Sequence, residues 1–204
     1  MTAISNLTRT KALTATGVFL LLFIALFIWQ TENTSNTDAA IEKLKEEGFV
    51  LHSAQGPVAL ADYQGKIVVL YFGYTYCPDI CPTSLGILSL ALNQLSAEEL
   101  ENVQPFFISL DPGRDTPERL HTYTSSFHPS IRGITGTALD IAQIAQQYSV
   151  MYMKVELEDS ALAYAVDHSS LYYILDRDGQ LMQTINHGTD PGQISAVLKQ
   201  ILRK

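Results

Sequence analysis

Basic residues and cysteines are both scarce in this sequence. Its 204 residues include 13 lysines and arginines against 21 acidic residues, and no basic patch or basic run appears. We therefore expect no nucleic-acid partner. Only two cysteines occur, which is too few for the framework of a disulfide-rich scaffold, and a chain of this length can bury a core without one. The two thiols therefore need a chemical explanation.

The two cysteines, Cys77 and Cys81, lie where a strand is predicted to give way to a helix. Residues 67–72 form a continuous apolar, β-branched run, which predicts a central strand buried on both faces. Residues 82–95 place apolar side chains at near-helical spacing, so Cys81 should lie at about the helix N-cap. Thiols at a helix N-terminus have lowered pKa values and act as nucleophiles or as ligands for soft metals. A buried structural disulfide is the alternative.

A small metal site on two thiolates needs a third ligand, and His168 is the leading candidate among five histidines. It lies in the segment V-D-H-S-S, a polar break between two apolar strand runs, where a side chain can project from the end of a sheet. A histidine held only by Asp167 or by the backbone is the alternative. We assign the other four to the surface: His52, His121, His128 and His187.

Two further groups of residues allow more than one interpretation. Met151 and Met153 alternate along a predicted strand and could offer soft sulfur ligands, but we expect them to fill the core. Asp111, Arg114 and Asp115 follow the predicted strand at residues 103–110. They form either a functional cluster or a turn with a fixed ion pair, and the sequence leaves both open.

An uncharged segment near the N-terminus predicts a membrane anchor. Residues 12–29 would form a helix of about 27 Å, close to the thickness of a bilayer core. No small-x-small cleavage site follows, so we expect an uncleaved anchor rather than a signal peptide. Arg9 and Lys11 place residues 1–11 in the cytoplasm by the positive-inside rule. Residues 30–48 are then a tether with a short helix at 38–47, and residues 49–204 form one domain facing the periplasm of a bacterium.

The predicted order of elements in that domain indicates an α/β fold. A hairpin at residues 49–60 is followed by strand–helix units starting at residues 67, 103 and 133. Strands at 151–156, 163–166, 171–175 and 181–186 come next, and a helix at 193–202 closes the chain. Parallel crossover units followed by antiparallel strands predict a thioredoxin-like sandwich, a mixed central sheet with helices on both faces.

Four segments together resemble the Sco/SenC family, in order and with similar spacing. They are F-G-Y-T-Y-C-P-D-I-C-P at residues 72–82, S-L-D-P-G-R-D-T-P at 109–117, F-H-P-S-I-R-G-I-T-G-T at 127–137 and V-D-H-S-S at 166–170. The resemblance implies a membrane-tethered, thioredoxin-like copper-binding protein that serves the dinuclear copper centre of cytochrome c oxidase. By that similarity Cys77, Cys81 and His168 are the copper ligands. Gly113 departs from the family, which commonly has a charged residue there.

Two functions remain open at this point. The first is a copper chaperone, not an enzyme, that passes Cu(I) or Cu(II) by ligand exchange to the copper-accepting subunit of the oxidase. Other periplasmic copper chaperones or thiol reductants are further expected partners. The second is a thiol–disulfide oxidoreductase, in which Cys77 and Cys81 form a catalytic redox pair that reduces partner cysteines.

Overall fold

The computed structural model describes residues 23–24, 27–30, 48–157 and 162–203, and residues 48–203 contain the folded domain. The predicted anchor at 12–29 falls largely outside the described residues, and the predicted short helix at 38–47 falls wholly outside them. Within the described part of the chain, no helix combines the length and the apolar character needed to cross a membrane.

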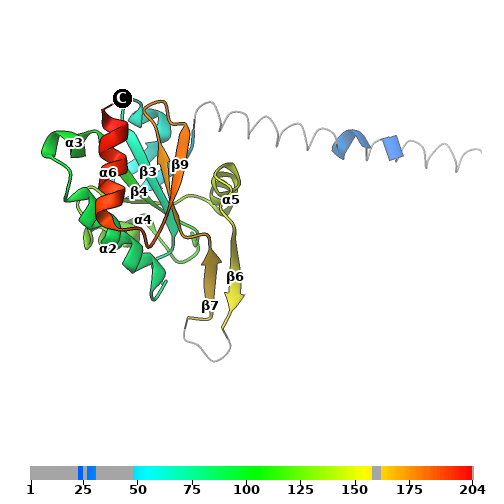
Figure 1. Cartoon of the computed structure of the whole chain (residues 1–204). Helices are drawn as coiled ribbons and strands as arrows, with labels where there is room; N and C mark the ends of the chain where they lie inside the picture. The colour runs from blue at the N-terminus through cyan, green and yellow to red at the C-terminus, as the bar shows by residue number, and fades with distance from the viewer. Residues whose placement is uncertain (1–22, 25–26, 31–47, 158–161, 204) are drawn as a thin grey trace, which may run out of the picture. The chain divides into compact units, whose positions relative to one another are not determined.

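The domain alternates strands and helices largely as the sequence predicts (Figure 1). The strands are β1 (Val50–Ser53), β2 (Gly56–Ala59), β3 (Ile67–Gly73), β4 (Val103–Ser109), β5 (Arg132–Ile134), β6 (Tyr152–Glu156), β7 (Tyr164–His168), β8 (Leu171–Leu175) and β9 (Leu181–Asn186). The helices are the 3-10 turn η1 (Leu60–Tyr63) and the α-helices α2 (Ile80–Leu92), α3 (Ala97–Glu101), α4 (Pro117–Ser125), α5 (Ala138–Gln147) and α6 (Pro191–Leu202).

A five-stranded mixed sheet with the strand order β5-β4-β3-β8-β9 forms the centre of the domain. β3 is parallel to β4, and β4 is parallel to β5, whereas β8 runs antiparallel to both β3 and β9. All seven residues of β3 are buried, as its continuous apolar run predicts. The register pairs Gly73 with Ser109, so the loops that leave β3 and β4 start beside each other at one edge of the sheet.

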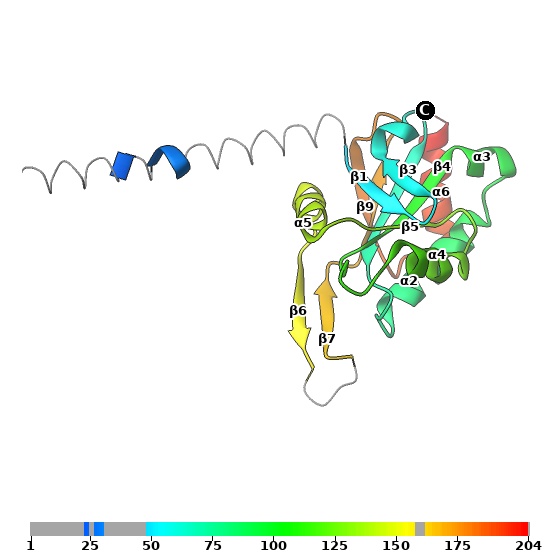
Figure 2. The same ribbon diagram turned by 180° about the vertical axis from the view of Figure 1, so that it is seen from behind.

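Alternating aromatic residues of β3 and β4 divide the core into two layers. Tyr71 stacks on Phe107 with ring centroids 6.2 Å apart, on the face covered by α2, α4 and α6. Phe72 points to the opposite face, where it lies 6.2 Å from Tyr148 at the end of α5. Figures 1 and 2 show α5 set apart from the other three helices. The predicted mixed sheet with helices on both faces is therefore confirmed, and it has thioredoxin-like topology.

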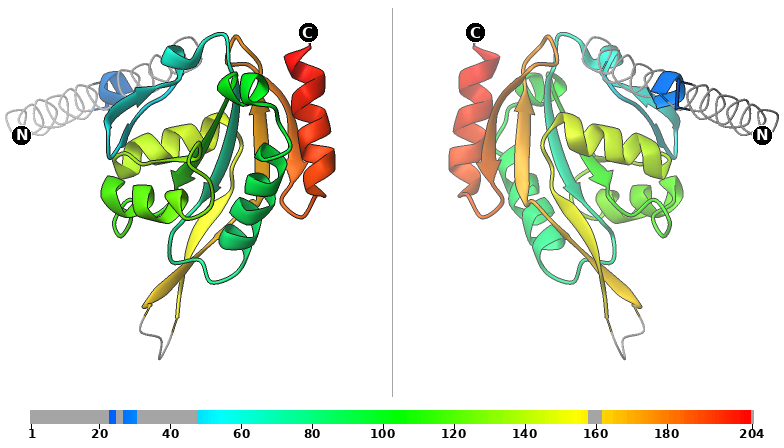
Figure 3. Two further views of the ribbon diagram at one scale, coloured as in Figure 1. Left: turned by 90° about the vertical axis from the view of Figure 1, so that its left-hand side faces the viewer. Right: turned by 90° about the vertical axis from the view of Figure 1, so that its right-hand side faces the viewer.

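The strands β6 and β7 form a hairpin of their own. Among the strands that the structure describes, they pair only with each other, in an antiparallel sheet in which Tyr152 faces His168. Figure 3 shows this hairpin projecting beyond the end of the central sheet. The two-residue link from His168 to β8 and contacts with the rest of the domain, rather than a shared strand ladder, therefore set its position relative to the central sheet.

Two local predictions need correction. Asp79 is the N-cap of α2, so the helix begins earlier than predicted and Cys81 lies inside its first turn. The short helix α3 was not predicted. It begins with a capping box, in which the Ser96 hydroxyl accepts from the Glu99 N–H and the Glu99 carboxylate accepts from the Ser96 N–H. This capping box is the sequence pattern from which the helix could be predicted.

Candidate metal centre

The first half of the site is the junction between β3 and α2. Cys81 is completely buried in the first turn of α2, and Cys77 lies before the helix with a partly exposed side chain. The Cys81 N–H donates to the Cys77 sulfur at 3.4 Å, so the helix N-terminus points at that sulfur. Gly73 at the end of β3 leaves the space for the second thiol, because a Cβ there would lie 2.7 Å from Cys81 Sγ.

The two thiols differ strongly in acidity. A hydrogen bond from the Cys81 thiol is the main cause that lowers the pKa of Cys77 to about 3, and backbone N–H groups add to it against the opposing effect of burial. The same hydrogen bond and burial raise the pKa of Cys81 well above its usual range. The hydrogen bond between the pair therefore favours the thiolate on Cys77 and the thiol on Cys81. Both cysteines are free.

His168 supplies the second half of the site from the last residue of β7, 87 positions after Cys81. Its Nε2 lies 3.5 Å from Cys81 Sγ, and its Nδ1 lies 3.1 Å from the Ser169 carbonyl oxygen. A carbonyl oxygen can only accept, so Nδ1 carries the hydrogen and Nε2 keeps its lone pair on the side of the sulfur. The rings of Tyr71 and Tyr74 meet the imidazole edge-on at 6.4 and 6.2 Å.

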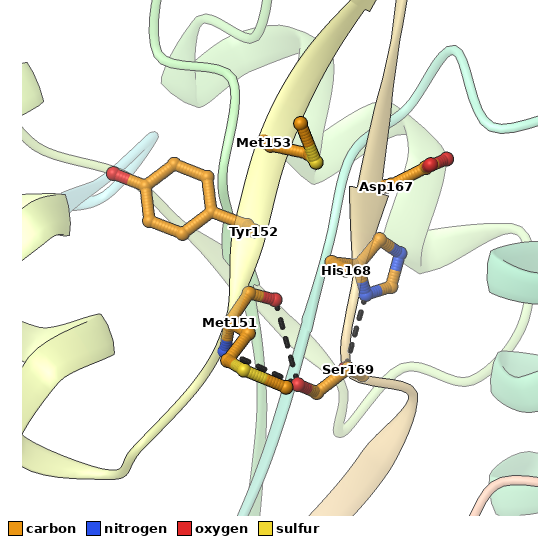
Figure 4. A pocket seen from close by; sticks show the side chains of 6 residues that line it. All are labelled: Met151, Tyr152, Met153, Asp167, His168 and Ser169. Atoms are coloured by element: carbon orange, nitrogen blue, oxygen red, sulfur yellow. Dashed lines mark hydrogen bonds between the residues drawn. The ribbon is translucent and has the colours of Figure 1, made fainter.

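The surroundings of His168 are open to solvent. A hollow of about 410 Å³ borders the imidazole, and Figure 4 shows its lining of Met151, Tyr152, Met153, Asp167, His168 and Ser169. The prediction that Met151 and Met153 fill the core is wrong, because their side chains are 78% and 62% exposed. Both lie on a hairpin with too little partner surface to cover them.

The structure thus brings the three sequence-predicted residues together pairwise, Cys77 with Cys81 and Cys81 with His168. Across the described residues, no group of three or more His, Cys, Asp and Glu side chains is close enough to hold a metal ion as it stands. One assignment among the other histidines is wrong. His128 is buried, with 5% exposure, and its Nδ1 accepts from the Ser130 N–H, so it has a structural role between α4 and β5.

Sequence reasoning missed a network of polar and aromatic residues behind the cysteines. The turn Asp111–Asp115 contacts Thr75 on one side and Tyr164 on the other. The sequence marks Asp111, Arg114 and Asp115 as a cluster but does not show their partners. Thr75 and Tyr164 are polar residues next to predicted strands, and only the folded chain shows that both reach the same turn.

Comparison with known proteins identifies the family. The SCO1/SenC family profile matches residues 37–203. The chain belongs to the SCO1/SenC family. The mitochondrial protein SCO2 of Saccharomyces cerevisiae is 35% identical over 163 residues, which is 79% of this chain and 54% of that protein. Protein SCO1 homolog 1 of Arabidopsis thaliana is 40% identical over 138 residues, 67% of this chain and 41% of that protein. The chain spans about half the length of these curated relatives.

Solved Sco structures share the fold. ScoI of Bradyrhizobium japonicum with copper bound has a TM-score of 0.69 and 38% identity, covering 76% of this chain and 97% of that one. Yeast Sco1 with copper bound has a TM-score of 0.67 and 35% identity, covering 75% of this chain and 86% of that one. BsSco, at 22% identity and a TM-score of 0.60, covers 76% of this chain and 91% of its own and is described as a member of the Sco family of cytochrome c oxidase assembly proteins.

Proposed function

We propose that this protein binds a copper ion through Cys77, Cys81 and His168 and delivers it to, or prepares, the dinuclear copper centre of cytochrome c oxidase. One observation carries the proposal. His168 Nε2 lies 3.5 Å from Cys81 Sγ with its lone pair available, although the two residues are 87 positions apart. Two sulfurs and one imidazole nitrogen form a donor set that suits copper, and two related Sco structures hold copper.

The acidities of the two thiols indicate the order of events in copper uptake. Cys77 already carries a thiolate and is partly exposed, so it meets the incoming ion first. Cys81 must release its proton to become a ligand, because only a thiolate binds metal strongly. His168 needs no proton transfer, since its Nδ1–H stays on the Ser169 carbonyl. Release to a partner would reverse this order as the partner's ligands replace each donor.

A thiol–disulfide oxidoreductase is the second candidate, and the low pKa of Cys77 favours it. In that reaction the Cys77 thiolate attacks a partner disulfide, which forms a mixed disulfide and releases one partner thiolate. The Cys81 sulfur, after losing its proton, then attacks Cys77 and frees the second partner thiolate. The partner is reduced by two electrons, and Cys77 and Cys81 are oxidised to a disulfide.

The same proposal includes the predicted location. Residues 12–29 would anchor the protein in the bacterial inner membrane, residues 30–48 would tether the domain, and residues 49–204 would face the periplasm. This arrangement suits delivery to the oxidase, because copper centre and chaperone would share one membrane surface.

A Cu(I) competition titration of the full-length protein in detergent tests the copper proposal. We expect His168→Ala to weaken Cu(I) binding about 10- to 100-fold, because a complete three-donor site becomes a dithiol site. His121→Ala is the matched control, since His121 is exposed on α4 and should leave the affinity unchanged. Equal affinity of the wild type and His168→Ala would refute the role of His168. Undiminished disulfide reductase turnover in that variant would then favour the second candidate.

A further inference from the structure

The two halves of the proposed copper site need a device that holds them together. Cys77 and Cys81 belong to the central sheet and α2, whereas His168 ends the hairpin β6–β7, which shares no ladder with that sheet. Figure 3 shows the hairpin extending away from the rest of the domain. A hairpin that tilts relative to the sheet could move the imidazole away from the sulfurs, so the contacts between the hairpin and the rest of the domain decide whether the site exists.

The turn Asp111–Asp115, which follows β4, makes those contacts on the side of the hairpin. The Tyr164 hydroxyl donates to Asp111 Oδ1 at 2.7 Å. Arg114 Nη1 donates to the carbonyl oxygens of Leu162 and Tyr164 at 2.9 and 3.1 Å, and its guanidinium lies 3.7 Å from the centre of the Tyr164 ring. Arg114 Nε also pairs with Asp111. The turn therefore binds both the backbone and a side chain at the start of β7.

Through its last residue, Asp115, the same turn also holds the cysteine loop, which leads from β3 to Cys77. Asp115 is fully buried, and its carboxylate accepts from the Thr75 N–H at 2.9 Å and from the Thr75 hydroxyl at 2.6 Å. Ser109 at the end of β4 donates to the same carboxylate at 2.7 Å. Thr75 lies two residues before Cys77, so the turn directly fixes the segment that leads to the first thiol.

Arg114 connects the two sides through aromatic rings as well. Its guanidinium lies 4.7 Å from the centre of the Tyr76 ring, next to Cys77, while it covers Tyr164 on the hairpin. Arg119 makes a similar contact with Tyr76, at 4.1 Å, and an ion pair with Asp115 at 3.7 Å. No contact of Arg119 with the described part of the hairpin is seen. Arg114 thus connects the turn to β7, whereas Arg119 contacts Thr75, Tyr76 and Asp115 on the side of the cysteine loop.

We infer that the turn Asp111–Asp115, anchored by its two buried aspartates, is a positioning device that sets the distance between His168 and the cysteine pair, with Arg114 and Tyr164 as positioning residues for the third copper ligand. This inference rests on the proposed function. A turn with a purely structural role would stabilise the fold without changing which ligands copper has. A positioning role predicts instead that breaking the contacts between the turn and the hairpin removes His168 from the copper ligands, as substitution of His168 would.

A double-mutant cycle in the full-length protein separates these two roles. We expect Arg114→Gln to weaken Cu(I) binding about tenfold, and Arg114→Gln with His168→Ala to bind no more weakly than His168→Ala alone. The Cu(II) electron paramagnetic resonance spectrum of Arg114→Gln should lose the coupling to the imidazole nitrogen. Arg132→Gln is the control, because Arg132 on β5 contacts Tyr63 of η1 rather than the cysteine loop or the turn, and it should keep both the wild-type affinity and that coupling.

A second variant covers the case in which Arg114→Gln does not fold. Tyr164→Ala removes the ring and the hydroxyl from the hairpin and leaves the turn itself intact, and it should show the same loss of affinity and of nitrogen coupling. Additive effects in the cycle, or a wild-type nitrogen coupling in Arg114→Gln or Tyr164→Ala, would overturn the inference. Unchanged binding in His168→Ala would instead overturn the proposed function, so the two failures are distinguishable.

Discussion

Cys77 and Cys81 differ by the position of one shared proton. The hydrogen bond between them lowers the pKa of Cys77 to about 3 and raises that of Cys81. Since a thiolate and not a thiol reacts with alkylating reagents, Cys77 should react readily near neutral pH and Cys81 should not. This difference makes the acidity of each thiol measurable in the metal-free protein.

Alkylation with iodoacetamide should modify Cys77 selectively. Because the folded pKa of Cys77 is depressed, its thiolate persists as pH falls, and its rate should stay nearly constant between about pH 5 and about pH 8. An ordinary thiol would slow about tenfold for each pH unit below its pKa. Mass spectrometry of quenched samples would follow both sites, with Cys77→Ser as the control. A Cys77 rate that falls tenfold per unit across this range would contradict the shared proton.

Residue types alone point to part of this site. A pair of thiols before a helix predicts a lowered pKa, and the position of His168 between two strand runs marks it as a ligand candidate. The difference between the thiols could not be predicted, because it depends on which sulfur is buried. The errors on Met151, Met153 and His128 have the same origin, since burial depends on neighbours that only the fold supplies.

At the scale of elements, α2 packs on the end of β3 without spare room. The space at Gly73 is bounded by Cys81 Sγ at 2.7 Å and by Phe107 Cε2 at 2.8 Å from the position of an added Cβ. Neither neighbour is the free end of a long flexible side chain, and both are fully buried. The contact therefore couples helix packing to the position of the second thiol.

Gly73→Ala should consequently damage both stability and copper binding. We expect the free energy of unfolding to fall by about 1–3 kcal/mol, because an extra methyl group must displace a packed neighbour. Cu(I) affinity should fall as well, since the added methyl group would also displace Cys81 Sγ, a proposed copper ligand. Urea denaturation and Cu(I) titration would measure the two effects, with Gly86→Ala as the control, because a Cβ at that position of α2 meets nothing within 4 Å. Wild-type values in Gly73→Ala would show that the junction adjusts freely.

The sequence predicts best the strands and helices that have strong local patterns. β3, α5 and α6 agree with the sequence prediction to within one or two residues, because each has a continuous apolar run or a clear cap. The five residues of α3 were too short for periodicity to show. The separate pairing of β6 with β7 could not be predicted, because alternation along a strand does not say which strand is its partner.

At the scale of the whole molecule, the proposed anchor should decide where the protein is found. We expect the full chain to stay in the membrane pellet after extraction with alkaline carbonate, because residues 12–29 would bury about a bilayer thickness of apolar helix. A chain that starts at residue 49 should remain in the supernatant and keep its Cu(I) affinity, since the described core lies entirely within the domain. Release of the full chain by carbonate would contradict the anchor.

The separation between His168 and the cysteines has a consequence for quality control. A newly made chain offers copper only a short dithiol segment, and closing the 87-residue loop to the imidazole costs conformational entropy that folding alone repays. If the proposed function holds, copper bound by all three donors would exist only on molecules whose sheet, turn and hairpin have assembled. A recipient that accepts copper from the complete site would then receive it from correctly folded molecules alone. A copper ion bound by all three ligands would thus mark a chaperone molecule that has finished folding.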